Sequence, residues 1–255
     1  MSASPSGPWF VCTRPRSGPD LRLFCFPHAG GGASIYRAWP SQVAAALEVV
    51  AVQLPGRESR LKEPLVDSLA PLVTALADVM APYTNAPYAF LGHSFGALLS
   101  FELIRELRRR GSSMPVCLFA SGRQAPRIPE PDPPLHRLPE PDFARAVHNR
   151  YNGIPQFIFD EPELLRLLLP ALRADLSMAE TYAYGDEAPL DCAISVFGGT
   201  LDHRLAKADL DAWRDETTAG CSVRLFPGGH FFLEHAQAQV LGAVSEEVQR
   251  RLASA

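Results

Sequence analysis

The feature that most constrains the fold is an alternation of short apolar segments with longer amphipathic ones. The short segments are continuous apolar runs, which is typical of parallel strands covered on both faces. They predict strands at residues 9–13, 21–27, 49–54, 88–92, 116–121, 192–198 and 222–226. The longer segments predict helices at residues 36–47, 68–81, 95–110, 205–216 and 231–252. Because parallel neighbours need crossover helices, this order predicts one α/β domain with a mostly parallel sheet flanked by helices.

The alternation is interrupted once, between the strands predicted at residues 116–121 and 192–198. Seven prolines stand between Pro126 and Pro141, and proline fits neither a helix interior nor a central strand. An amphipathic helix is then expected over residues 161–184, with a kink at Pro170. Its apolar face consists of Leu165, Leu168, Leu172, Leu176 and Ala179. We interpret the segment as an inserted helical lid over the carboxyl edge of the sheet, where such sheets bind ligands. The alternative is a structural appendage far from any site.

A very tight turn is predicted at residues 92–96, where Gly-His-Ser-Phe-Gly matches the G-x-S-x-G nucleophile elbow. A strand precedes this turn and a helix follows it, so its flanking positions tolerate little beyond glycine. Ser94 lies at the start of the helix, where backbone N–H groups favour a developing negative charge. The pattern predicts Ser94 as a nucleophile, and the alternative is a serine in an ordinary strand–helix turn.

A serine hydroxyl needs an adjacent base, which is itself oriented by a carboxylate. In the α/β-hydrolase fold these residues occur in the order Ser, Asp or Glu, His, each just after a strand. Asp202 and His230 satisfy this order, and each follows a strand and a pair of glycines. We therefore predict this fold with Ser94, Asp202 and His230 as the catalytic triad. The rival carboxylates, Asp209 and Asp211, lie inside the next predicted helix.

His230 is one of seven histidines, and the others fit the role of the base less well. Two lie in the lid, one lies in the last helix, and one precedes the final strand; these are His136, His148, His235 and His203. The remaining two, His28 and His93, are neighbours of the predicted site. Together with Gly30 they are predicted to shape it.

The oxyanion hole is expected to use the backbone N–H of Phe95 and a second N–H from the loop after an early strand. That loop has the sequence Pro-His-Ala-Gly-Gly-Gly over residues 27–32. Three glycines can also indicate phosphate binding. Because no G-x-G-x-x-G or GK[ST] motif follows, the sequence argues against a nucleotide site.

Composition excludes several other classes of function. A net charge of −4 argues against a nucleic-acid partner, which would call for a basic surface. The five cysteines are widely spaced without a CxxC pair, which favours free thiols over disulfides or metal ligands. The first twenty residues lack an apolar signal core, and no apolar stretch approaches membrane-spanning length. We expect a cytoplasmic protein with no membrane association, no metal and no cofactor.

Several longer runs resemble the type II thioesterases, the stand-alone editing enzymes of nonribosomal peptide and polyketide synthesis. They are LFCFPHAGGGASIYRAWP, VQLPGRESRLKEP, GHSFGALLSFEL, LLLPALRADLSMAETYAY, FGGTLDH and FPGGHFFL, in the family's order over nearly the whole chain. The resemblance implies hydrolysis of acyl thioesters on the phosphopantetheine arm of carrier proteins. Its usual purpose in this family is to clear stalled or mis-primed acyl groups.

The resemblance also implies roles for individual residues. Ser94 becomes the nucleophile, His230 the base and Asp202 its orienting acid. The backbone N–H groups of Ala29 and Phe95 become the oxyanion donors. The lid, at residues 123–184, would border the acyl pocket and the path of the phosphopantetheine arm.

Carrier proteins are typically acidic, so a basic approach to the site would help docking. Cations on loops near this edge are Arg57, Arg60, Lys62, Arg123 and Arg127; the alternative is ordinary solvated surface charge. Three other functions stay open. They are a generic carboxylesterase or lipase with the same triad, a chain-releasing thioesterase of fatty-acid synthase type, and a non-catalytic binding protein on a hydrolase fold.

Overall fold

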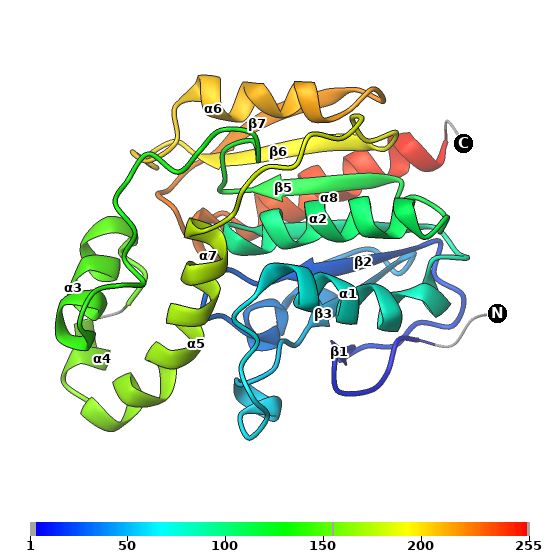
Figure 1. Cartoon of the computed structure of the whole chain (residues 1–255). Coiled ribbons are helices and arrows are strands. Elements are labelled where there is room, and N and C mark those ends of the chain that lie inside the picture. Colours follow the sequence, from blue (N-terminus) through cyan, green and yellow to red (C-terminus); the bar gives the residue numbers. More distant parts are fainter. Residues whose placement is uncertain (1–3, 155, 254–255) are drawn as a thin grey trace.

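The computed structural model describes residues 4–154 and 156–253, whose strands form one seven-stranded sheet (Figure 1). The strands are β1 (Phe10–Val11), β2 (Leu21–Phe26), β3 (Leu47–Val52), β4 (Tyr88–His93), β5 (Cys117–Ser121), β6 (Ala193–Gly199) and β7 (Cys221–Phe226). They lie in the order β1-β3-β2-β4-β5-β6-β7. Only β1 is antiparallel to its neighbour, so the predicted mostly parallel sheet is confirmed. Helices able to span a bilayer are missing from this part of the chain.

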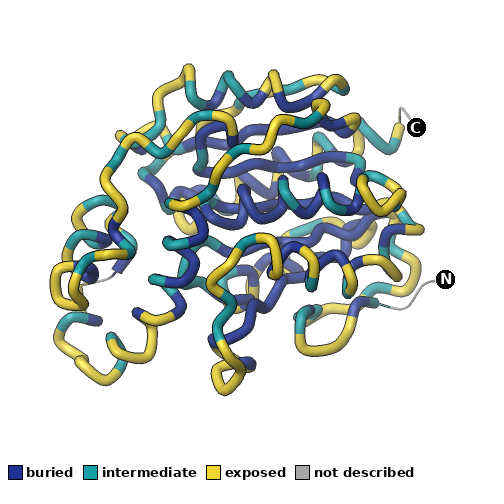
Figure 2. The backbone as a smooth tube through the Cα atoms, in the orientation of Figure 1, coloured by how far each residue is buried: buried dark blue, intermediate teal, exposed yellow. Residues whose placement is uncertain are grey.

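Both faces of the sheet are covered along β2 to β6, which explains why these strands are mostly apolar, whereas the edge strand β7 carries the exposed residues Ser222 and Arg224. Alternate residues of a strand point to opposite faces. In β2, Phe24 and Phe26 pack with helices α1 (Leu69–Met80) and α2 (Phe95–Arg109), whereas Leu23 and Cys25 pack with α8 (Gln237–Leu252). Strands β2 to β6 and the helix surfaces that touch them are accordingly buried (Figure 2).

The strand order reverses at β2, which has β3 on one side and β4 on the other. The segment after β2 therefore leads to one side of the sheet and the segment after β4 to the other. Open α/β sheets bind ligands in the crevice between two such diverging segments. The loop at residues 27–32 follows β2, and Ser94 follows β4. The topology thus brings two of the predicted site segments together.

Three helices lie between β5 and β6, at the carboxyl end of the sheet (Figure 1). They are α3 (Glu140–Tyr151), α4 (Gln156–Phe159) and α5 (Pro162–Glu180), and they enclose a small apolar core of their own that includes Phe143, Val147 and Leu169. Only α5 is predicted from the sequence, and it ends at Glu180 rather than at residue 184. The helix continues through Pro170.

The helix predicted at residues 36–47 is wrong. The chain instead makes two 3-10 turns, Ala33–Tyr36 and Trp39–Ser41, and β3 begins at Leu47. Pro40 has no N–H to donate within a helix, and it occupies the first turn of the second segment. The short turns also let Tyr36 and Trp39 pack edge to face, with 4.8 Å between their ring centres, beneath the sheet.

Two other predicted helices are interrupted. The segment at residues 205–216 consists of α6 (Lys207–Asp211) followed by a 3-10 turn, Ala212–Glu216. This tighter turn places Trp213 in the core, where its Nε1–H donates to the backbone oxygen of Arg123 at 2.9 Å. The segment at residues 231–252 divides into α7 (Phe232–His235) and α8, with a non-helical ψ of 22° at Ala236 between them.

Candidate active site

Ser94 lies in a sharp turn between β4 and α2. Its φ of 55° and ψ of −112° are strained for a residue with a side chain. Backbone contacts explain the flanking glycines. A Cβ atom on Gly92 would lie 2.1 Å from the carbonyl oxygen of Gly96, and one on Gly96 would lie 2.2 Å from that of Phe26. The G-x-S-x-G pattern is therefore what allows the turn to pack against β2.

The structure brings the three predicted triad residues into one hydrogen-bonded chain. His230 Nε2 lies 3.1 Å from Ser94 Oγ, and His230 Nδ1 lies 2.9 Å from Asp202 Oδ2. When Nδ1 donates to the carboxylate, Nε2 is free to accept the serine proton. The rival carboxylates are engaged elsewhere, because Asp209 accepts from the backbone of Ala206 at the start of α6 and Asp211 pairs with a lysine.

Asp202 is held as a carboxylate. Burial by itself raises the pKa of Asp202. The hydrogen bond and charge of His230 lower it, and so do the backbone N–H and charge of Arg204; together they outweigh burial. The net pKa lies below the ordinary value. A carboxylate here keeps the imidazole of His230 oriented and stabilises its protonated form. Sequence reasoning missed Arg204, which stands two residues after Asp202.

His28 and His93, predicted to shape the site, form an aromatic cluster beside His230 together with Phe231. The ring centres of His28 and Phe231 are 5.0 Å apart, and those of His93 and His230 are 5.3 Å apart. Desolvation, followed by the charge of His230, lowers the pKa of His28 to about 4 and that of His93 well below its ordinary value. Both rings are therefore neutral at pH 7 and do not oppose a positive charge on His230.

The lowered pKa of His28 predicts a loss of stability in acid. Between about pH 6.5 and pH 4 the unfolded chain binds a proton at His28 that the folded chain does not, so stability falls as the pH falls. His28→Gln removes this contribution and should lessen the loss between pH 7 and pH 4.5 by about 2–3 kcal/mol. Urea denaturation at both pH values measures it. His235→Gln, at an exposed position, is the control, and equal losses in the two variants would contradict the prediction.

The two predicted oxyanion donors border the same cavity as Ser94. Phe95 is the first residue of α2, so its N–H has no partner within the helix. The N–H of Ala29 donates to no other residue within the described ranges. Two unoccupied N–H groups beside a serine Oγ are the arrangement that stabilises a tetrahedral oxyanion.

A buried ion pair supports the loop that carries Ala29, and sequence reasoning missed it. Arg57 donates through both Nη atoms to Asp175 of α5, and Nη2 lies 3.0 Å from Oδ1. Asp175 Oδ2 also accepts the N–H of Gly30 at 2.8 Å. The carbonyl oxygen of Ala29 in turn lies 3.0 Å from Nδ1 of His28. The peptide between Ala29 and Gly30 is therefore held at both ends.

Arg57 and Arg60 are neither docking cations nor solvated surface charges. Both are more than nine-tenths buried. Arg57 is occupied by Asp175, while Arg60 stacks 4.0 Å from the ring of Trp9 and donates to the backbone oxygen of Gln53. Of the other cations considered, Lys62 and Arg127 are exposed, whereas Arg123 is partly buried beside the site.

Two cavities extend from Ser94 and His230 beneath the inserted helices. The first is mainly apolar and continues between α4 and α5; its lining includes Val147, Leu172 and Phe231, and further out Ile158, Leu165 and Leu168. The second is more enclosed and is the more polar of the two, and its lining includes Arg123, Gln124, Glu130, Glu180 and Arg204. The two cavities therefore meet at Ser94 and His230 and differ in polarity.

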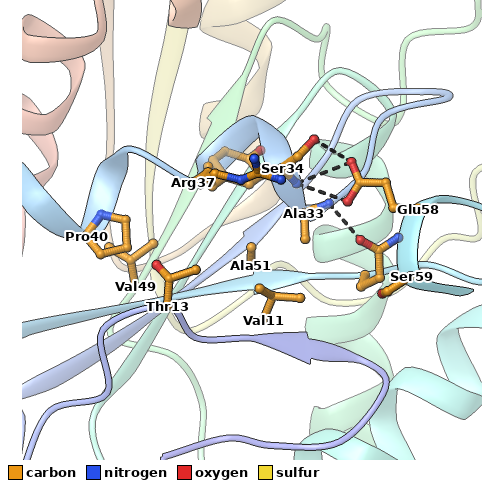
Figure 3. Close-up of a pocket in the computed structure, with 12 residues that line it drawn as sticks. Val11, Thr13, Ala33, Ser34, Arg37, Pro40, Val49, Ala51, Glu58 and Ser59 are labelled. Atoms are coloured by element: carbon orange, nitrogen blue, oxygen red, sulfur yellow. Dashed lines mark hydrogen bonds between the residues drawn. The ribbon is translucent and has the colours of Figure 1, made fainter.

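A larger groove lies elsewhere, along β1 and β3, and contains no triad residue (Figure 3). Several of its polar groups pair with one another: the Glu58 carboxylate accepts from the backbone and hydroxyl of Ser34, and Gln53 accepts from the N–H of Ala33. Its lining includes no histidine or cysteine. The hydrogen-bonded Ser94 site is therefore the candidate active site.

Known proteins resemble this chain over nearly its whole length. The sequence model of a family described as the thioesterase domain matches residues 21–248. The gramicidin S biosynthesis protein GrsT of Aneurinibacillus migulanus is 40% identical, over 96% of this chain and 95% of GrsT. RedJ, a thioesterase of the prodiginine pathway of Streptomyces coelicolor, superimposes with a TM-score of 0.85 at 35% identity, over 93% and 94% of the two chains. The type II thioesterase BorB of the borrelidin cluster also gives a TM-score of 0.85, at 31% identity over 96% and 97%.

Proposed function

Because the chain belongs to the type II thioesterases of nonribosomal peptide and polyketide biosynthesis, a family of thioester hydrolases, we propose that it removes acyl groups from the phosphopantetheine arms of carrier proteins. The observation that supports this most directly is the chain of hydrogen bonds from Ser94 through His230 to Asp202, at the base of cavities that the lid (residues 123–184) covers. Membership in this family favours an enzyme over a non-catalytic binding protein.

The proposed reaction begins with acylation of Ser94. The Oγ–H proton passes to Nε2 of His230 as Oγ bonds to the thioester carbonyl carbon. The N–H groups of Ala29 and Phe95 stabilise the negative charge on the former carbonyl oxygen. The C–S bond then breaks, and His230 returns the proton to the thiolate. The products of this step are the free phosphopantetheine thiol and an ester on Ser94.

Water completes the cycle. His230 takes a proton from a water molecule as its oxygen attacks the ester carbonyl carbon, and a second oxyanion forms in the same hole. The bond to Ser94 Oγ breaks, His230 gives the proton back to Oγ, and the carboxylic acid leaves. The residues of the site supply every proton transfer, so the proposed mechanism uses no cofactor other than the substrate's own arm.

In the cell, the proposed role is editing within the cytoplasm. The partners are acyl or peptidyl carrier proteins of a modular synthase, and the purpose is to free arms that carry a stalled or mis-primed acyl group. A chain-releasing thioesterase of fatty-acid synthase type and a generic carboxylesterase would use the same triad. Substrate comparison separates these three functions.

The test is hydrolysis of one acyl group in three forms: on a carrier protein, on free pantetheine and on p-nitrophenol. The proposal predicts that kcat/KM for hydrolysis of the acyl group is higher on the carrier protein than on pantetheine or p-nitrophenol. Ser94→Ala gives the background rate without the nucleophile. Rapid cleavage of the p-nitrophenyl ester with no preference for the carrier would overturn carrier recognition. A steep preference for long acyl chains on the carrier would point to the chain-releasing function instead.

A further inference from the structure

The polar cavity beside Ser94 contains two donors that no residue of the described ranges occupies. Arg123 and Gln124 follow β5 after Gly122 and line this cavity together with Ser94 and His230. Gln124 is 7% exposed, and its amide makes no hydrogen bond within the described part of the chain. At the wall of a cavity, an amide without a protein partner has two N–H donors and an acceptor oxygen available to a ligand.

Arg123 is the stronger of the two donors. Its Nε is buried without a partner, and its guanidinium forms no ion pair with a described carboxylate. Desolvation lowers the pKa of Arg123, and the charge of Glu130 offsets this only in part. A partly buried cation without a partner is costly, and an acceptor oxygen would relieve the cost.

The other charged groups of this cavity are already paired. Arg204 binds Glu130 and Asp132 and stacks 4.3 Å from the ring of Tyr151. Glu180 accepts from two backbone N–H groups and from the ring of His136. Nε of Arg204 is also without a partner, but Arg123 is the arginine of this cavity whose side chain has no carboxylate partner and no hydrogen bond among the described residues.

We infer that Arg123 and Gln124 form a recognition site for acyl groups that carry an oxygen acceptor, as a hydroxyl, keto or carboxylate group. The inference rests on the proposed function, because it takes the acyl arm of the thioester into the polar cavity. The apolar cavity, which reaches the surface at Leu168, is then left for the phosphopantetheine arm. The donors from the protein and the acceptor from the substrate satisfy one another only when an oxygenated acyl group is bound.

The test compares acyl groups of equal length as pantetheine thioesters. Wild type should hydrolyse 3-hydroxybutyryl thioester with a kcat/KM at least about tenfold above that for butyryl thioester. Arg123→Met should lower kcat/KM for the hydroxylated substrate about 10- to 100-fold and change that for butyryl less than about threefold. Gln124→Leu should lower the ratio of kcat/KM for 3-hydroxybutyryl thioester to kcat/KM for butyryl thioester, but to a smaller extent than Arg123→Met. Acetoacetyl and malonyl thioesters identify which kind of oxygen the site prefers.

Arg127→Met is the matched control, because Arg127 lies on the same segment but is exposed and pairs with Glu216. Arg127→Met should leave the ratio of the two kcat/KM values, 3-hydroxybutyryl to butyryl, unchanged. Thermal melting and labelling of Ser94 by a fluorophosphonate check that Arg123→Met folds with an intact triad. Equal rates for the two substrates in wild type, or equal losses for both in Arg123→Met, would overturn the inference. Failure of the proposed function is different, since wild type would then hydrolyse neither thioester.

Discussion

Ser94→Ala is expected to lower kcat for acyl thioesters roughly 10⁴- to 10⁶-fold. The substitution removes the atom that bonds to the carbonyl carbon, and no other hydroxyl lies within hydrogen-bond distance of His230 Nε2 in the described residues. The two N–H groups of the oxyanion hole stay in place, so some acceleration over water should persist. Steady-state hydrolysis of an acyl-pantetheine measures the effect.

Ser100→Ala is the matched control for this substitution. Ser100 lies in α2, six residues after Ser94, is fully buried and donates to the carbonyl oxygen of Ala97 at 3.1 Å. Its replacement costs a hydrogen bond of about 1 kcal/mol in stability but touches no group of the site. The two variants should therefore melt close to wild type and differ only in turnover. Retention of more than about a tenth of wild-type kcat in Ser94→Ala would remove Ser94 from the mechanism.

Much of the fold could be predicted because its elements rest on local patterns. Most strands are apolar on both faces, and all seven begin and end within two residues of the predicted bounds. Helices α1 and α2 follow their apolar stripes. The predictions failed where packing overrides the pattern, as at residues 36–47. They also missed α3, which follows proline-rich sequence, and α4, which has only four residues.

The residues of the site likewise divide into those that the sequence predicts and those that it does not. The elbow has a strict backbone requirement that is visible as two glycines, and the fold limits the order of its partners. Arg57 and Asp175, by contrast, meet across 118 positions of the chain. Nothing in the neighbourhood of either residue indicates the other, and as single charges both look like surface residues. That the two side chains are buried, and that they pair with each other, becomes visible only when the loop after β3 and helix α5 are placed together.

The Arg57–Asp175 pair leads to the second large expected effect. Asp175→Asn should lower kcat about a hundredfold with little change in KM, because losing one oxyanion donor costs about 10²- to 10³-fold. The variant keeps an oxygen for the N–H of Gly30 but weakens the bidentate contact with Arg57. The Ala29–Gly30 peptide is then held less firmly, and we expect the neighbouring His28–Ala29 peptide, which carries the Ala29 N–H donor, to lose its fixed orientation. Arg57→Met should act in the same direction. Affinity for a boronic acid, whose adduct places an oxygen in the hole, should fall in parallel with kcat.

The control must be another buried ion pair, because breaking any such pair destabilises a protein. Arg22 and Glu48 provide it: Nε and Oε2 lie 2.7 Å apart, and both side chains are at most 2% exposed. They lie near the amino ends of β2 and β3, at the edge of the sheet opposite Ser94. Glu48→Gln should lower the melting temperature as Asp175→Asn does, yet leave kcat and boronate affinity at wild-type values. If both variants lose activity only in proportion to their unfolded fraction, then Asp175 merely stabilises the fold. If Asp175→Asn loses kcat while folded, α5 positions the oxyanion hole as well as covering it.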